Sequence, residues 1–246
     1  MRYETPSSGL CRSLPGDHRR VELERAKSLT VLAFEQVLEG IVEGSIPFGT
    51  LLSEKALAAS FGTSKTPVRE AFVQLQALKL VEILPQRGCL VLTPGIGEVR
   101  ELCEFRLELE WTALRFSLER APERLVAELG AVLARMDGAP LRGGPESYHA
   151  LDDRFHRVFF AASGNALLEG AYLALSPRIQ ALRANLSTPN AAIVEDSRRE
   201  HAAILALATA GDREALRCEL VRHIGRISDA YSRSIETEAA KASGGV

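Results

Sequence analysis

The sequence lacks any long hydrophobic run and is poor in cysteine. No apolar stretch among its 246 residues approaches the roughly 18 to 20 that span a bilayer. The N-terminal segment also lacks the apolar core of a signal peptide. The four cysteines, Cys11, Cys89, Cys103 and Cys218, form no C-x-x-C pair, which is typical of free thiols in a reducing compartment. These absences argue against a membrane-spanning or disulfide-stapled protein and predict a cytoplasmic one.

The composition is that of a folded protein with a substantial core. Hydrophobic residues make up 46% and charged residues 25% of the chain. The length exceeds the commonest size of a single domain, so two domains are expected. The formal net charge of −2 argues against a chain coated throughout in basic residues for nucleic acid. Residues 1–22, which mix Pro, Gly, Ser and charge without periodicity, are expected to be a flexible arm, and residues 241–246 a flexible tail.

Residues 23–94 show three helical patterns followed by two strand patterns. Apolar spacing predicts a helix at about 23–42, which "EGSIPFG" ends, then a short helix that stops at Gly62. A third helix opens with Ser64 as its N-cap. Two β-prone runs, 80–84 and 89–93, are joined by "PQRG" and predict a hairpin. Three helices followed by a hairpin form a winged helix-turn-helix.

Residues 95–240 carry no strand signals. Pro- and Gly-containing breaks separate six helical segments, at about 97–119, 122–137, 145–162, 165–187, 190–210 and 212–236. With no strands to cover, six amphipathic helices close on one another as a bundle. The predicted fold is therefore mainly α, with an N-terminal winged helix-turn-helix and a C-terminal all-α helical bundle.

Polar side chains gather where a helix-turn-helix meets DNA. The first turns of its second helix enter the major groove, and a hairpin tip can reach the minor groove. Two cations on a helix face are, taken alone, more often solvated surface; the helix order, the N-cap and the following hairpin favour DNA binding. The candidate contacts are Lys55, Ser64, Lys65, Thr66, Arg69, Arg87 and Gly88.

Three histidines on three predicted helices face the interior of the bundle. A single histidine on an apolar face is usually a core residue, but three unpaired imidazoles in one core are costly to desolvate. A divalent metal bound by three imidazole nitrogens and one carboxylate removes that cost, with Zn²⁺ the first choice and Mn²⁺ or Ni²⁺ possible. The candidate ligands are Asp152, His156, His201 and His223, with His149 and Asp153 as alternatives.

Two arginines of the bundle are expected to face inward, Arg106 and Arg183. A buried arginine needs an anionic partner, so either could hold a carboxylate ligand. A structural ion pair of Arg106 with Glu110 is an equal alternative. Trp111 and Phe155 are expected in the core.

The run "LLSEKALAASFGTSKTPVREAFVQLQALKLVEILPQRGCLV" resembles the DNA-binding domain of the GntR superfamily of bacterial transcription regulators. The resemblance implies that the seven candidate residues named above contact operator bases and phosphates. Lys55 and Lys65 stand where the family usually has Arg, and a lysine cannot form the two-pronged contact with guanine.

The helical half resembles the FCD ligand-binding domain of the FadR family, through "EFRLELEWTAL", "LDDRFHRVFFAASGN", "REHAAILALATAGD" and "VRHI". This resemblance implies that Asp152, His156, His201 and His223 bind the metal and that the cavity takes a small carboxylate. A bundle of six helices resembles the VanR-type subgroup of this family.

These patterns predict a homodimeric regulator, more in keeping with a repressor, that binds a palindromic double-stranded operator. A carboxylate at the metal site would set its affinity for DNA. Two alternatives are a metal-dependent enzyme acting on a small carboxylate and a binding module that no longer binds DNA. The lack of an acid or base beside the ligands, apart from Asp153, argues against an enzyme.

Overall fold

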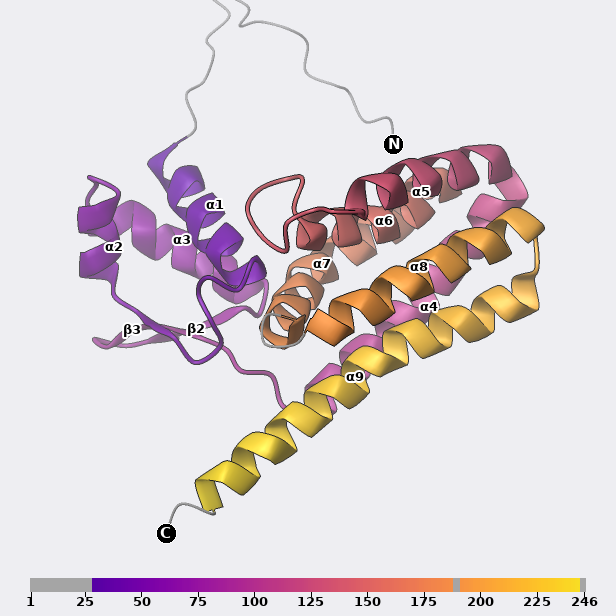
Figure 1. Ribbon diagram of the computed structural model, residues 1–246. Helices are drawn as coiled ribbons and strands as arrows, with labels where there is room; N and C mark the ends of the chain where they lie inside the picture. The colour runs from indigo at the N-terminus through magenta and orange to yellow at the C-terminus, as the bar shows by residue number, and fades with distance from the viewer. Residues whose placement is uncertain (1–27, 188–190, 244–246) are drawn as a thin grey trace, which may run out of the picture.

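The structure, a computed structural model, describes residues 28–187 and 191–243. The expected arm at 1–22 lies outside these residues. The order of elements is α1 (Leu29–Val42), β1 (Leu51–Leu52), α2 (Glu54–Ser60), α3 (Lys65–Ala77), β2 (Val81–Leu84), β3 (Gly88–Val91), α4 (Ile96–Arg120), α5 (Pro122–Met136), α6 (Tyr148–Ser163), α7 (Ala166–Ser187), α8 (Ala191–Ala210) and α9 (Arg213–Ser243). Figure 1 shows the predicted fold class, a small N-terminal module beside a larger helical bundle.

The N-terminal module, α1 to β3, closes around its own core. Val68, Phe72 and Leu75 on one face of α3 are fully buried and pack with Val37 and Ile41 of α1. The other face of α3 stays exposed, and most of its side chains are polar. The helix-turn-helix therefore presents α3 to solvent while its apolar stripe anchors it.

Local signals explain how α2 and α3 end and begin. Gly62, in the left-handed conformation with φ of 62°, follows the C-cap Phe61 and ends α2 as expected. Ser64 is the N-cap of α3, but its side chain makes no capping hydrogen bond. The hydroxyl of Ser64 is therefore not committed to its own helix.

The hairpin gains a third strand that the sequence did not predict. Residues Leu51 and Leu52 pair antiparallel with Leu90 and Cys89 of β3, giving the strand order β1-β3-β2. A strand of two residues has too few positions to show an alternating pattern. It becomes a strand only because the hairpin offers β3 as a partner.

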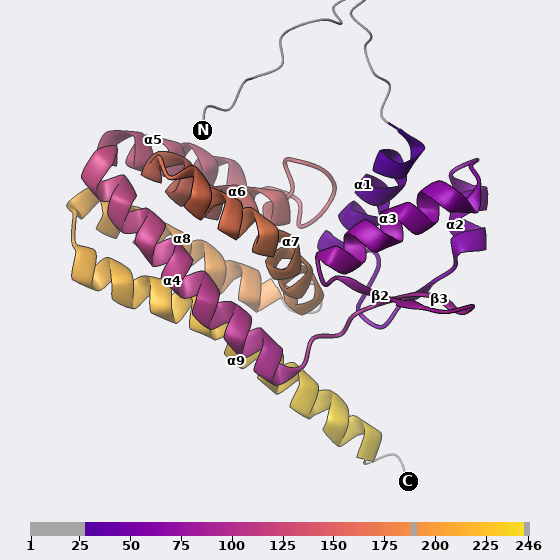
Figure 2. The same ribbon diagram turned by 180° about the vertical axis from the view of Figure 1, so that it is seen from behind.

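The bundle is built around α6, which packs against α4, α5 and α7. Helices α4 and α9 lie side by side along its length, as both views show (Figures 1 and 2). Phe155 and Phe159 of α6 are fully buried, and Phe155 belongs to the core as predicted. Helix α9 reaches Ser243, so helix covers the first residues that were expected to be a tail.

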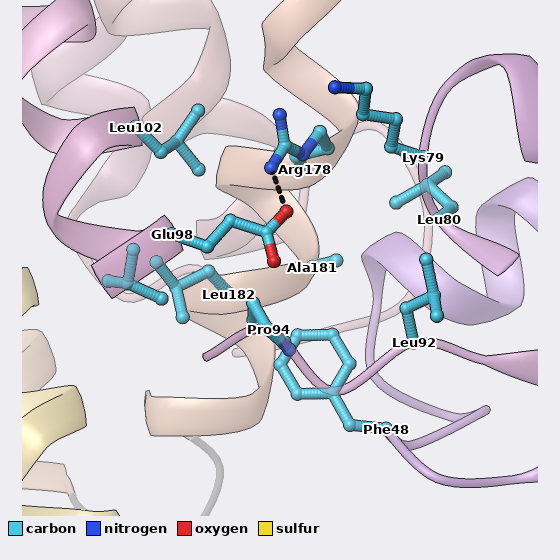
Figure 3. A pocket seen from close by; sticks show the side chains of 11 residues that line it. Phe48, Lys79, Leu80, Leu92, Pro94, Glu98, Leu102, Arg178, Ala181 and Leu182 are labelled. Carbon is cyan, nitrogen blue, oxygen red and sulfur yellow. Dashed lines mark hydrogen bonds and ion pairs between the residues drawn. The ribbon is translucent and has the colours of Figure 1, made fainter. Parts of the chain in front are cut away.

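The module rests on the side of α7. The backbone N–H of Phe48 donates to Oδ1 of Asn185 at 3.3 Å. A Cβ added at Gly44 would lie 3.2 Å from Cβ of Ala184, so the chains approach closely there. Figure 3 shows the small apolar pocket at this seam, where Arg178 of α7 pairs with Glu98 of α4. Helix α7 thus belongs to the bundle and also supports the N-terminal module.

Candidate functional site

Three buried histidines meet in the bundle, one each from α6, α8 and α9. His156, His201 and His223 are at most 1% exposed. Nε2 of His156 lies 3.4 Å from Nε2 of His201 and 3.2 Å from Nε2 of His223. One nitrogen of each ring lies within 4.8 Å of those of the other two. The structure therefore brings together the three histidines that the sequence singled out.

Carboxylates contact two of these rings at Nδ1, the nitrogen that points away from the cluster. Oε2 of Glu110 lies 2.8 Å from Nδ1 of His156, and Oε2 of Glu200 lies 2.8 Å from Nδ1 of His223. An ionised carboxylate only accepts hydrogen bonds, so these two Nδ1 atoms carry the protons. Their Nε2 lone pairs then face the centre of the cluster.

The third ring differs. Nδ1 of His201 is buried without a hydrogen-bond partner, and its Nε2 lies 3.4 Å from Oδ1 of Asp152. Burial lowers the pKa of His201 to about 3 and also lowers the pKa of His156 and of His223. All three imidazoles are thus neutral, the form that binds metal ions.

Asp152 lies beside the cluster and is bound to Arg183. Burial opposes its ionisation, but the charge of Arg183 lowers the pKa of Asp152 below its ordinary range. Asp153, the alternative ligand, instead accepts a hydrogen bond from Oγ of Ser176 of α7 at 2.6 Å. His149 is buried in the first turn of α6 and is not a member of the histidine cluster.

Arg106 is buried, as predicted, and is bound to Glu110. Its Nε lies 2.6 Å from Oε1 of Glu110, and its Nη2 lies 3.1 Å and 3.2 Å from the two ring nitrogens of His156. Burial opposes the charge of Arg106, but Glu110 raises its pKa further above the ordinary value. The structural ion pair considered for Arg106 is therefore present.

An acid–arginine pair stands beside each histidine. Besides Glu110–Arg106 and Asp152–Arg183, Glu200 accepts hydrogen bonds from Nε and Nη2 of Arg226, each at 2.8 Å. Burial raises the pKa of Glu200, but its bonds with His223 and Arg226 outweigh this and lower it to about 2. Three acids and three arginines balance in charge. A divalent cation among the histidines would leave an excess of positive charge that suits an anion.

Sequence reasoning missed the orienting role of Glu110 and Glu200. The sequence predicts Glu110 only as a partner of Arg106 and predicts no role for Glu200, which directly precedes His201. The signal available in the sequence is an acid at a position that helical periodicity assigns to the inner face of a helix. That signal is weak, because many acids at such positions lie at the edge of a bundle and are exposed to solvent.

A pocket opens next to the cluster, between α6, α7, α8 and α9. It is lined by Tyr148, His149, Asp152, Arg183, Leu186, Ile193, Val194, Ser197, Arg226, Ile227 and Ala230. Its volume of ≈ 30 Å³ holds roughly one or two water molecules. Of the two predicted clamp arginines, Arg183 lines this pocket and Arg106 does not.

The predicted DNA contacts lie around one exposed face. Lys55, Lys65, Arg69 and Arg87 line a groove between the start of α3 and the hairpin turn, and Ser64 and Thr66 are exposed at the start of α3. Gly88 also lines this groove, but the position of an added Cβ is directed at β1. Its φ is 121°, and an added Cβ would lie 2.3 Å from the carbonyl oxygen of Leu52. Gly88 is thus required where β3 passes β1.

Comparison with known proteins agrees with this arrangement. Residues 29–91 match the sequence model of the bacterial regulatory proteins of the gntR family, and residues 101–226 match that of the FCD domain. The chain belongs to the GntR family and carries an FCD domain.

Relatives of this GntR-family chain are transcription regulators. It is 31% identical over 202 residues to the "Probable D-xylose utilization operon transcriptional repressor" of Paenarthrobacter nicotinovorans, covering 79% of this chain and 84% of that protein. It is 28% identical over 198 residues to the transcriptional repressor RspR of Escherichia coli, covering 80% and 86%. The solved structure of E. coli McbR/YncC has a TM-score of 0.70 at 25% identity, covering 85% of this chain and all of that one.

Family membership settles the coarse function. The chain is a DNA-binding transcription regulator of a family that includes repressors, and the metal-dependent enzyme alternative is wrong. Within the described residues, none of the helices has the length and apolarity to cross a membrane.

Proposed function

We propose that this GntR-family chain is a cytoplasmic, homodimeric repressor whose operator affinity responds to a small carboxylate bound at a metal site in the FCD domain. The observation that carries the proposal is the convergence of three buried imidazoles, with one nitrogen of each ring within 4.8 Å of those of the other two. The Nε2 lone pairs of His156 and His223 face one another 3.2 Å apart and repel without a shared proton or cation, so the arrangement fits a bound cation.

His156, His201 and His223 would hold the metal, with Asp152 as the fourth ligand because its Oδ1 already lies on the inner side of His201. Three nitrogens and one oxygen suit Zn²⁺ best, and Mn²⁺ or Ni²⁺ are compatible. When bound, the ion supplies positive charge that attracts an anion. Glu110 and Glu200 fix the rings of His156 and His223, and such orienting partners strengthen metal binding.

The pocket beside the cluster supports the assignment of a carboxylate. Arg183, which pairs with Asp152, lines the pocket, and its guanidinium can also form a forked contact with a carboxylate, whereas Arg106 does not line the pocket. Arg183 is therefore the better clamp candidate. Because the pocket holds only about two water molecules, a carboxylate larger than these would have to move the surrounding helices apart to enter.

That movement would reach the DNA-binding module through α7. The same helix carries Arg183 at the pocket and Asn185 at the seam with Phe48. A ligand shifts an equilibrium only if it binds one arrangement better, and opening of this pocket supplies such a difference. Two copies of the module, set by a homodimer, would read the two halves of a palindrome.

The contacts with DNA are proposed for Lys55, Ser64, Lys65, Thr66, Arg69 and Arg87, which are all exposed on one face. Arg87 at the hairpin turn suits the minor groove. Gly88 contributes to this contact indirectly. Because it has no side chain, β3 can lie close to β1, and this packing sets the position of the hairpin turn that carries Arg87.

Metal analysis of the purified protein tests the proposal. We expect about one metal ion per chain in the wild type, and loss of it in the double variant His156→Ala, His201→Ala. His149→Ala is the matched control, since it removes a buried histidine of α6 that lies outside the cluster.

A thermal-shift screen of small carboxylates follows on the wild type and the double variant. Stabilisation of the wild type but not of the double variant would support the sensor and name the class of ligand. A wild type that stays metal-free after reconstitution and responds to none of the carboxylates would refute the metal site and show that the histidines are only core residues. Light scattering of the wild type tests the homodimer.

A further inference from the structure

Glu54, at the start of α2, is the acid among the residues that line the groove on the DNA-binding face. The other charged residues that line it are the cations Lys55, Lys65, Arg69 and Arg87. A carboxylate that faces DNA phosphates generally weakens binding, because phosphate charge dominates affinity. The contacts of Glu54 therefore determine how it affects DNA recognition.

Glu54 holds the guanidinium of Arg69 with two parallel hydrogen bonds. Nε of Arg69 donates to Oε1 at 3.1 Å, and Nη2 donates to Oε2 at 2.8 Å. A paired contact of this kind fixes the plane of the guanidinium. Hydrogen bonding with Arg69 lowers the pKa of Glu54, with a further contribution from the charge of Lys65.

The ion pair leaves the outer edge of the Arg69 guanidinium, formed by Nη1 and Nη2, free to contact a base. The Arg69 side chain remains 65% exposed while that of Glu54 is 21% exposed. Glu54 occupies the Nε side of the guanidinium, so Nη1 and the second hydrogen of Nη2 are available. Two such donors match the O6 and N7 acceptors of guanine in the major groove.

We infer that Glu54 is a positioning residue for base reading, which holds Arg69 so that its outer edge meets one guanine of the operator. The inference rests on the proposed DNA contacts and adds to them the residue that orders Arg69. Lys65, the other cation at the start of α3, has no fork to read guanine in this way. Sequence preference therefore depends on the direction in which Arg69 points, and a fixed side chain loses less freedom on binding.

Binding to two duplexes tests the inference. The probes are the duplex that the wild type enriches from a randomised double-stranded library and a scrambled duplex of the same composition. For Glu54→Ala, we expect tighter binding to the scrambled duplex and a fall of about tenfold in the ratio of the two affinities. Repeating the enrichment with this variant should lose the preference for guanine at one position in each half-site.

Glu70→Ala is the matched control. It removes the same charge from the exposed face of α3, but Glu70 contacts Oγ1 of Thr30 (2.7 Å) and not a DNA-facing cation. We expect it to leave the affinity ratio unchanged. Glu54→Gln, which keeps the shape and one acceptor oxygen, should give an intermediate ratio.

A double-mutant cycle separates positioning from a structural role. If Glu54 acts through Arg69, the double variant Glu54→Ala, Arg69→Ala should have the affinity ratio of Arg69→Ala alone. A Glu54→Ala ratio equal to the wild type, or losses that add in full, would overturn the inference while leaving DNA binding intact. A wild type that enriches no sequence would instead refute the proposed DNA-binding function and the inference with it.

Discussion

Arg183 and Asn185 lie two residues apart on α7 and contact different domains. Arg183 pairs with Asp152 beside the histidine cluster, whereas Oδ1 of Asn185 accepts a hydrogen bond from the backbone of Phe48 in the DNA-binding module. Successive turns of a helix move together because their backbone hydrogen bonds are continuous. Under the proposed function, a ligand that displaced Arg183 would therefore also move the seam, which lies within one turn of helix.

Asn185→Ala should weaken the effect of the carboxylate on DNA affinity without weakening binding of the carboxylate. The variant removes one seam hydrogen bond, worth about 1 kcal/mol, so the coupling should fall severalfold. The measurement is DNA affinity with and without the carboxylate found in the thermal-shift screen. Gln180→Ala is the control, since Gln180 bonds Ser176 on the same helix away from the seam. Equal coupling in the wild type and Asn185→Ala would rule out this route.

Glu200→Ala should weaken metal binding about 10- to 100-fold although Glu200 is not itself a ligand. The variant removes the acceptor that holds Nδ1 of His223 and leaves Arg226 without its main partner. Competition with a chromophoric chelator measures the affinity. Glu195→Ala removes an exposed acid from the same helix and should bind metal like the wild type. An unchanged affinity in Glu200→Ala would show that the orientation of His223 does not depend on this carboxylate.

Gly88→Ala should destabilise the winged module by about 3 kcal/mol. The left-handed φ of 121° disfavours a side chain, and the new Cβ would collide with the carbonyl oxygen of Leu52. Gly62→Ala provides the comparison, because Gly62 has a positive φ of 62° but no atom within 4 Å of an added Cβ. That variant should lose only about 1 kcal/mol. Urea unfolding of the full chain followed by circular dichroism compares the two, and equal losses would contradict the predicted collision.

Cys218 should react with a thiol reagent in the folded protein, while Cys89 and Cys103 should react only after unfolding. Cys218 is exposed and the other two are buried. Burial raises the pKa of Cys89 to about 12 and also raises the pKa of Cys103, which disfavours the reactive thiolate of both residues. Thiol counting at pH 7 and pH 9 in a Cys11→Ser background checks this. A second thiol that reacts quickly in the folded state would show that one of these cores opens.

Local pattern was enough to predict the helices, the hairpin and the inward faces. Periodic apolar residues, the glycine at the end of α2 and the "PQRG" turn act over a few residues, so they can be read without knowing the fold. The same periodicity placed His156, His201 and His223 on buried faces. The order of the helices then indicated that the three histidines converge, and the structure confirms that they lie together.

Pairing between distant side chains could not be read in this way. Glu54 meets Arg69, Asp152 meets Arg183 and Glu200 meets Arg226 because helices cross at particular angles and depths. Strand β1 exists only because the hairpin presents an unpaired edge to Leu51 and Leu52. Sequence periodicity specifies the face on which a residue lies. The partner across that face, and therefore the charge and direction of each functional side chain, depends on how the helices pack.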